Sequence, residues 1–256
     1  MSPPETTGPP PLRFGLIVIG DELLGGGRQD RHLAHFKALL QGRGLDLGWY
    51  WLLPDEPEVL TAHLRFSMAC GGPVFVCGGI GATPDDHTRA CAAAAAGVAL
   101  SRHPQAAALI EGRFGPQAYP ERIAMADLPE GSQLIPNPVN RIPGFQLRDH
   151  HFLPGFPEMA WPMAQSVIED RYPIAGEPLR ALAVRIVGVP ESRLIPLMRR
   201  LGPRFPEQKL FSLPHLGPPP HVLLGLRGRA GIETAFAALC EELAREGLAY
   251  EVSTAQ

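Results

Sequence analysis

Apolar runs of strand length alternate with segments of helical periodicity along the first hundred residues. The strand-length runs are residues 12–19, 45–53 and 73–77. Apolar side chains recur at helical spacing within residues 30–42 and 56–69, and an alanine-rich helix is predicted over residues 84–96. This order is typical of a parallel sheet whose strands are joined by right-handed crossovers. The pattern therefore predicts an α/β fold.

The pattern changes beyond residue 100. Further helices are predicted at 104–114 and 116–126, followed by a proline-rich stretch at 135–145 and a strand that turns into a helix within 150–160. After a break at 172–178, the order is strand, helix, strand, strand, helix, strand, at residues 180–188, 190–201, 207–213, 221–227, 231–246 and 248–252. We predict a disordered tail over 1–11, a main domain over 12–172 and a small α+β domain over 178–256.

Composition narrows the functional classes. The 256 residues carry a formal net charge of −3, with 45% hydrophobic and 19% charged residues, so neither nucleic acid nor an acidic membrane surface is an expected partner. No apolar run approaches the length of a membrane span. The four cysteines form no C-x-x-C pair, which favours reduced thiols and a cytoplasmic location. The first residues lack the features of a signal peptide.

Two unusual loops follow predicted strands. Gly20-Asp21-Glu22 ends the first strand and Gly78-Gly79 ends the third. Because ligands of parallel sheets bind beyond the carboxyl ends of the strands, we expect both loops at one ligand site.

The segment GGIGATPDDHTR, residues 78–89, allows two interpretations. In the first, Thr83 is a helix N-cap, Pro84 the first helical residue and Asp86 the third, so the acids only stabilise a helix start. In the second, the glycines let backbone N–H groups bind phosphate. A divalent cation would then offset the acidic charge. Its ligands would be Asp21, Glu22, Asp85 and Asp86.

Four ordered motifs complete the picture, namely IGDELLGGGRQDRH (19–32), GGIGATPDDHT (78–88), IPNPVNRIPGF (135–145) and LPGFPEM (153–159). Together they resemble the molybdopterin-binding-domain family, and within it the branch of competence/damage-inducible protein A (CinA). The resemblance implies a three-layer α/β/α domain with a mostly parallel sheet, which binds a nucleotide or pterin at the strand ends. It also implies a homodimer, with a trimer as the alternative.

In the CinA-like branch the implied activity is metal-dependent pyrophosphate hydrolysis of ADP-ribose or FAD-like compounds. In the molybdenum-cofactor branch it is the binding and handling of molybdopterin. The implied cofactor is Mg²⁺ or Co²⁺, with K⁺ as a further candidate. Matched motif positions assign catalysis to Asp86, Asp85 and Asp21, and the metal to these with Glu22. Matched or neighbouring positions assign substrate binding to Gly20, Gly78, Gly79, Gly81, Thr83, Thr88, Asp30 and Asn137.

Several positions depart from the family pattern. His32 replaces an Asn, Ala82 a Pro and Asn140 a Gly, and Ala124-Met125 stands where a Lys-Gln pair is usual. Losing that lysine removes a phosphate contact, for which Arg122 or Arg141 are substitutes. His87 is either a general acid or a solvated loop residue.

The small C-terminal segment resembles a KH-like domain. It has no G-x-x-G and no basic excess, so RNA binding is not expected. No deamidase domain follows it in this chain, so nicotinamide mononucleotide deamidation is not expected either. The leading hypothesis is a metal-dependent nucleotide pyrophosphatase, and the alternative is a molybdopterin- or nucleotide-binding protein without hydrolysis.

Overall fold

The computed structural model describes residues 12–172 and 177–253. The predicted tail, residues 1–11, lies outside the described residues, as does much of the predicted break at 172–178. The chain divides into two compact units, Met1–Ala175 and Gly176–Gln256.

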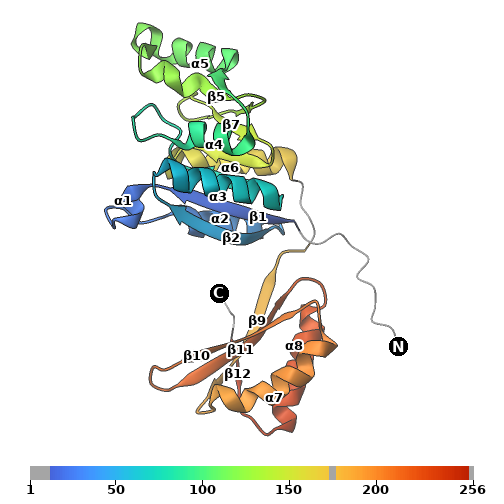
Figure 1. Ribbon diagram of the computed structural model, residues 1–256. Coiled ribbons are helices and arrows are strands. Elements are labelled where there is room, and N and C mark those ends of the chain that lie inside the picture. Colours follow the sequence, from blue (N-terminus) through green and yellow to red (C-terminus); the bar gives the residue numbers. More distant parts are fainter. Residues whose placement is uncertain (1–11, 173–176, 254–256) are drawn as a thin grey trace. The chain divides into compact units, whose positions relative to one another are not determined.

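The first unit is built on a six-stranded sheet in the order β2-β1-β3-β8-β7-β6 (Figure 1). Its strands are β1 (Arg13–Ile19), β2 (Asp46–Leu53), β3 (Val74–Cys77), β6 (Gln133–Ile135), β7 (Gly144–Leu147) and β8 (His150–Leu153). Strands β2, β1, β3 and β8 pair in parallel, whereas β7 and β6 pair antiparallel. The predicted α/β fold with a mostly parallel sheet is confirmed.

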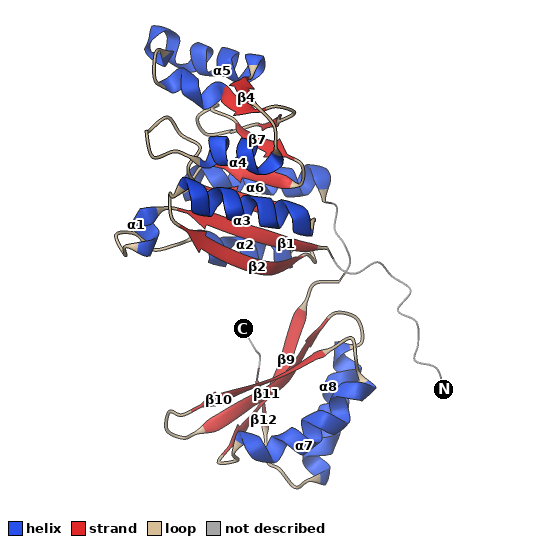
Figure 2. Ribbon diagram, in the orientation of Figure 1, coloured by secondary structure: helices blue, strands red, loops and turns tan. Residues whose placement is uncertain are grey.

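Alternate side chains of β1 enter two separate cores. Phe14, Leu16 and Val18 pack with helices α2 (His32–Gln41) and α6 (Pro157–Arg171). Ile17 and Ile19 pack on the opposite face with helices α3 (Pro57–Cys70), α4 (Thr88–Ala96) and α5 (Pro104–Phe114). Because successive strand side chains point to opposite faces, one central strand serves both layers. This arrangement is the predicted three-layer α/β/α architecture (Figure 2).

Two predicted helices differ in the structure. The segment 116–126 forms two 3-10 turns, η1 (Gly115–Ala118) and η2 (Arg122–Ala126), instead of one helix. Pro120 interrupts it, because proline lacks an N–H donor and disfavours helical backbone in the residue before it. The helix predicted over 84–96 begins only at Thr88. A short two-stranded sheet, β4 (Leu100–Arg102) with β5 (Asp127–Pro129), has no counterpart among the predicted elements.

The second unit has the predicted β-α-β-β-α-β order. Its elements are β9 (Arg180–Val187), α7 (Glu191–Leu201), the turn η3 (Gly202–Arg204), β10 (Lys209–His215), β11 (His221–Gly228), α8 (Ile232–Arg245) and β12 (Glu251–Ser253). The strands form an antiparallel sheet in the order β10-β11-β9-β12. Helices α7 and α8 both cover one face of this sheet and share its apolar core (Figure 2).

Two expectations from the sequence, unpaired cysteines and the lack of a membrane-spanning run, agree with the described residues. All four cysteines are unpaired. In the part of the chain that the structure describes, every helix is too short or too polar to cross a bilayer.

Candidate functional site

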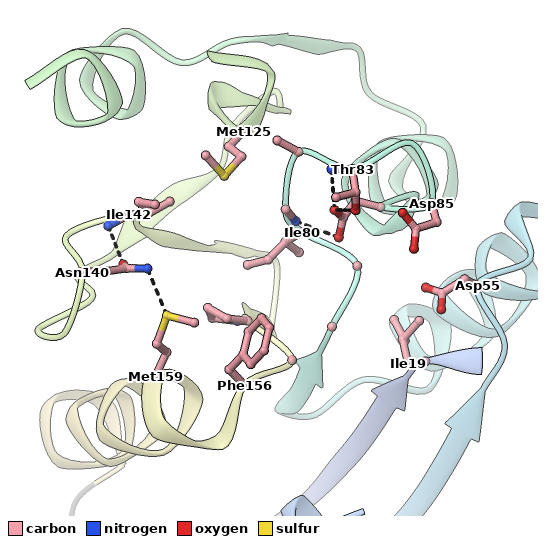
Figure 3. A pocket seen from close by; sticks show the side chains of 18 of the residues that line it. Ile19, Asp55, Ile80, Thr83, Asp85, Met125, Asn140, Ile142, Phe156 and Met159 are labelled. Atoms are coloured by element: carbon pink, nitrogen blue, oxygen red, sulfur yellow. Dashed lines mark hydrogen bonds between the residues drawn. The ribbon is translucent and has the colours of Figure 1, made fainter. Parts of the chain in front are cut away.

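A cavity of about 410 Å³ opens beyond the carboxyl ends of β1 and β3. Figure 3 shows side chains from several loops turned toward it. Of the predicted site residues, the lining includes Gly20, Glu22, Gly78, Gly79, Gly81, Thr83, Asp85, Asp86 and Asn137. Both loops singled out in the sequence therefore meet at this cavity. The two loops are close to sixty residues apart in the sequence, and the parallel pairing of β1 with β3 brings them together.

The glycine loop needs its first two glycines for steric reasons. Gly78 and Gly79 have φ angles of 116° and 65°, which disfavour other residues. A Cβ on Gly78 would lie 2.4 Å from the Ile19 carbonyl oxygen, and one on Gly79 would lie 2.2 Å from Thr88 Oγ1. Glycine thus allows the loop to pass directly over the end of β1 and the start of α4.

Asp86 organises this loop from within. Its Oδ1 accepts a hydrogen bond from the Gly81 N–H at 2.9 Å, and its Oδ2 accepts from the Thr83 N–H at 2.8 Å and the Thr83 hydroxyl at 2.5 Å (Figure 3). The helix-cap interpretation of the segment is wrong, because the N-cap of α4 is His87 and Asp86 precedes the helix. Asp86 instead closes a turn that shapes the glycine loop.

Arg89 anchors the same loop from the protein interior, and sequence reasoning missed it. This side chain is 8% exposed. Its Nη2 donates to the Gly81 carbonyl at 2.8 Å, and its Nη1 donates to the carbonyls of Ala124 and Asp127. Burial lowers the pKa of Arg89, while the charges of Asp86 and Asp127 raise it. The guanidinium therefore ties the glycine loop to the segment that ends in β5.

Acidic side chains gather at one edge of the cavity. Glu22 of the short helix α1 (Asp21–Leu24), Asp55 of the loop after β2 and Asp85 of the loop after β3 all line it. Figure 3 shows the carboxylates of Asp55 and Asp85 turned toward each other. Asp55 was missed in the sequence. It lies two residues beyond β2, so the strand-end rule that found the other two loops could have found it as well.

The environments of two of these acids differ. Burial raises the pKa of Asp55, and the charges of Asp21, Glu22 and Asp85 raise it further against a hydrogen bond from the Asp21 N–H. The pKa of Asp85 is lowered by the neighbouring Thr83 side chain, although the Thr83 hydroxyl itself donates to Asp86, and by its own backbone N–H. Asp85 is therefore the more firmly ionised of the pair.

Three predicted site residues lie beside the cavity and do not line it. The Asp21 carboxylate accepts a hydrogen bond from the Asp55 N–H at 3.2 Å. Asp30 accepts hydrogen bonds from the N–H groups of His32 and Leu33, at 2.8 and 3.1 Å, and lines a neighbouring cavity of about 400 Å³. Thr88 is fully buried beneath Gly79. These three residues are therefore placed to support the loops around the cavity and not to contact a ligand in it.

Asn137 also lines the cavity. Its Oδ1 accepts from the Val139 N–H at 3.0 Å, while its buried Nδ2 has no hydrogen-bond partner among the described residues. The wall around it is apolar and consists mainly of Ile80, Met125, Ile142, Phe156 and Met159 (Figure 3). An unpartnered buried donor is costly, and a polar ligand atom would satisfy it.

Known proteins resemble this chain in sequence. Residues 15–173 match the family described as a probable molybdopterin binding domain. The chain belongs to this family. A CinA-like protein from Geobacter sp. (strain M21) is 30% identical over 250 residues, which cover 93% of this chain and 59% of that protein. One from Myxococcus xanthus is 31% identical over 213 residues, covering 76% and 49%. The chain thus spans about half the length of these relatives.

A solved structure has the same fold as the first unit. The crystal structure of the protein CinA, of unknown function, from Thermoplasma acidophilum aligns with a TM-score of 0.57 and 25% identity. The alignment covers 62% of this chain and 98% of that one. Family and fold agree with the resemblance inferred from the motifs.

Departures from the molybdopterin-binding-domain pattern cluster at the cavity. Met125 and Asn140 both line it. The Asn140 side chain accepts from the Ile142 N–H at 2.9 Å and donates to Met159 Sδ at 3.0 Å. His32 Nε2 donates to the carbonyl of Gly155, a lining residue, at 3.0 Å. Arg122 instead lies over the Phe114 ring and is not among the lining residues.

Proposed function

We propose that the cavity binds a compound containing a pyrophosphate and hydrolyses that pyrophosphate with the help of a divalent cation. The proposal rests on one observation, namely that a glycine loop and several carboxylates line the same cavity. The Gly78–Gly81 loop lies in the same cavity as carboxylates from three separate segments, Glu22, Asp55 and Asp85. The N–H groups of Gly78 and Gly81 already donate to the Leu153 carbonyl and to Asp86, which leaves those of Gly79 and Ile80 for phosphate oxygens. Carboxylates suit the cation that a phosphate brings.

The donor set fits a hard cation. Within residues 12–172 and 177–253, no group of three or more His, Cys, Asp or Glu side chains forms a ready-made metal site. Mg²⁺ differs from zinc in this respect, because it is usually held by one or two carboxylates together with waters and substrate phosphates. Asp85, with Asp55 or Glu22, supplies such oxygens. When bound, the cation would offset phosphate charge and lower the pKa of a water molecule.

The protein's own groups then have separate tasks. The lowered pKa of Asp85 suits a group that stays ionised, whereas the raised pKa of Asp55 suits a group that exchanges a proton. Asn137 offers its free Nδ2 to the ligand. The apolar wall around Met125 and Phe156 suits a planar ring and keeps water from it.

A second candidate is binding of a pterin phosphate without hydrolysis. The missing lysine favours it, because Ala124 lies where the family pattern has a lysine that would contact phosphate, and the apolar Met125 beside it lines the cavity. Arg28 lines the cavity as a cation, but it lies 3.7 Å from Glu22 and over the Phe156 ring. Little positive charge is therefore free to stabilise a leaving phosphate.

A product assay tests the first candidate. The purified chain is incubated with ADP-ribose or FAD in Mg²⁺, Co²⁺ or EDTA, with and without K⁺, and AMP is measured. We expect AMP with either metal and none in EDTA. A folded, metal-loaded protein that binds added molybdopterin and releases no AMP would support the second candidate. A protein that binds none of these compounds would refute both.

A further inference from the structure

A second cavity shares a wall with the first. It has a volume of about 510 Å³ and lies between α5 and the turn that follows Asn137. Leu109, Gly112 and Arg113 of α5 line one side, and the other side is lined by Val139, Asn140 and Arg141. Asn140 also lines the first cavity, at the edge seen in Figure 3. A ligand that passes this side chain would occupy both cavities.

Two arginines give this second cavity a charge opposite to that of the first. Among the described residues, neither Arg113 nor Arg141 has a carboxylate within 4.0 Å or donates a side-chain hydrogen bond. Many other arginines of the chain are paired, for example Arg43 with Glu169 at 2.5 Å. Two guanidinium groups around one cavity repel each other unless an anion lies between them.

Helix electrostatics explains only one of these arginines. Arg113 lies in the last turn of α5, where a cation suits the helix dipole. Arg141 lies in no helix, so a helix dipole does not explain its place at the cavity. Its φ angle is 66°, a conformation that is costly for a residue with a Cβ. The turn fixes it there, since the Arg141 N–H donates to the Asn137 carbonyl at 3.1 Å and the Ile142 N–H to Asn140 Oδ1 at 2.9 Å.

We propose that Arg113 and Arg141 form a subsite for an additional phosphate group, carried by the ligand of the first cavity beyond its pyrophosphate. This inference rests on the proposed function for its ligand, which is then a nucleotide with a further phosphate on its ribose. Paired guanidinium groups bind phosphate through charge-assisted hydrogen bonds. Leu109 and Val139, 43% and 57% exposed, give the sugar or base an apolar surface.

The first test addresses the arginines directly. Inorganic pyrophosphate is titrated by calorimetry into the full chain at low salt in EDTA, where the carboxylates of the first cavity repel it. We expect the Arg113→Gln/Arg141→Asn double variant to bind about tenfold more weakly than the parent chain. Asn is chosen at position 141 because it tolerates the left-handed conformation. Arg65→Gln/Arg199→Gln, which removes two exposed arginines from α3 and α7, is the matched charge control.

A third variant blocks the space without removing charge. A Cβ at Gly112 would meet nothing within 4 Å, and Gly112 lines the cavity, so Gly112→Leu places an apolar side chain in this space. The change also replaces a helical glycine by a better helix former. We expect an unchanged or higher melting temperature together with weaker pyrophosphate binding. Equal affinity of the parent, double variant and Gly112→Leu would overturn the proposal.

The second test links the two cavities. Affinities for ADP-ribose and ADP-ribose 2′-phosphate are compared in Mg²⁺. We expect a preference of about tenfold for the phosphorylated compound, lost in the double variant and in Gly112→Leu. Binding of ADP-ribose without any such preference would refute the subsite and leave the proposed function standing. If neither compound binds, the proposed function fails, and the titration in EDTA still decides whether the arginines bind phosphate.

Discussion

Asp21 and Asp55 accept hydrogen bonds from each other's backbone. The Asp21 N–H donates to Asp55 Oδ2 at 3.1 Å, and the Asp55 N–H donates to Asp21 Oδ1 at 3.2 Å. This exchange joins the loops after β1 and β2 at the acidic edge of the first cavity. It also concentrates negative charge there, which together with burial raises the pKa of Asp55.

The first prediction concerns Asp55→Asn. The amide oxygen keeps an acceptor for the Asp21 N–H, and the change removes one of several mutually repelling charges. We expect thermal stability to be unchanged within about 1 kcal/mol. Metal-dependent release of AMP from ADP-ribose should fall by about a hundredfold or more, since a proton-exchanging group is lost.

The matched control is Asp170→Asn, which removes an exposed carboxylate from α6. It should retain full activity. Full activity of Asp55→Asn, in a sample with the parent's melting temperature, would contradict the role assigned to Asp55.

Asp86→Ala should act on the loop first and on the ligand second. The change removes the acceptor of three hydrogen bonds from Gly81 and Thr83. We expect a loss of about 1–3 kcal/mol in the free energy of unfolding, because hydrogen bonds to charged groups are among the stronger ones. Urea unfolding measures this loss.

Asp86→Asn is the informative companion, because it keeps one carbonyl oxygen for the loop. We expect it to recover part of the stability and part of the ligand affinity. If Asp86→Ala were as stable as the parent and only turnover were lost, Asp86 would act on the substrate and the loop-shaping role would be wrong.

The periodic parts of the fold could be predicted from the sequence because each residue type there reflects its own burial. The runs that became β1 and β3 are apolar on both faces, as strands between two helical layers must be. Gly78 and Gly79 stood out for a similar reason, since only glycine fits their backbone. These features depend on local chemistry.

The chemistry of the site depended on partners distant in sequence. Asp85 and Asp86 are identical neighbours in the sequence, yet Asp86 turns back onto Gly81 while Asp85 faces Asp55 (Figure 3). In the sequence, Arg89 is only one polar position at the start of an alanine-rich helix. Its burial arises from a segment more than thirty residues away, which covers it with the carbonyls of Ala124 and Asp127. No spacing rule reports such contacts.

Arg89→Met tests that anchor. The variant leaves the carbonyls of Gly81, Ala124 and Asp127 without their donor in a largely buried position. We expect a loss of about 2–4 kcal/mol in the free energy of unfolding, together with weaker binding of any ligand of the glycine loop.

Arg102→Met provides the comparison, because Arg102 forms a half-exposed ion pair with Asp127, one of the residues that Arg89 contacts. Its loss should be below about 1 kcal/mol. Equal effects of the two variants would mean that the buried hydrogen bonds of Arg89 contribute nothing specific.

The last prediction concerns pH. Burial lowers the pKa of His150 to about 4 and that of His151 to about 3, with smaller effects from nearby Arg148 and Arg171. Both histidines are neutral in the fold and hydrogen-bonded, to Ser67 Oγ at 2.8 Å and to the Tyr172 hydroxyl at 2.9 Å. The unfolded chain takes up protons on them as the pH falls through about 6.5, before the folded chain does.

Stability from these histidines is therefore complete above about pH 6.5 and is lost as the pH falls toward their folded-state pKa values, at about 1.4 kcal/mol per pH unit for each histidine. Urea unfolding at pH 7.5 and 5.0 measures it. Tryptophan fluorescence reports the first unit, because Trp49, Trp51 and Trp161 all lie there. His150→Gln should reduce the pH dependence by the share of one histidine, about 1.4 kcal/mol per pH unit below pH 6.5. An unfolding free energy that is equal at the two pH values in the parent chain would show that neither histidine is held neutral by the fold.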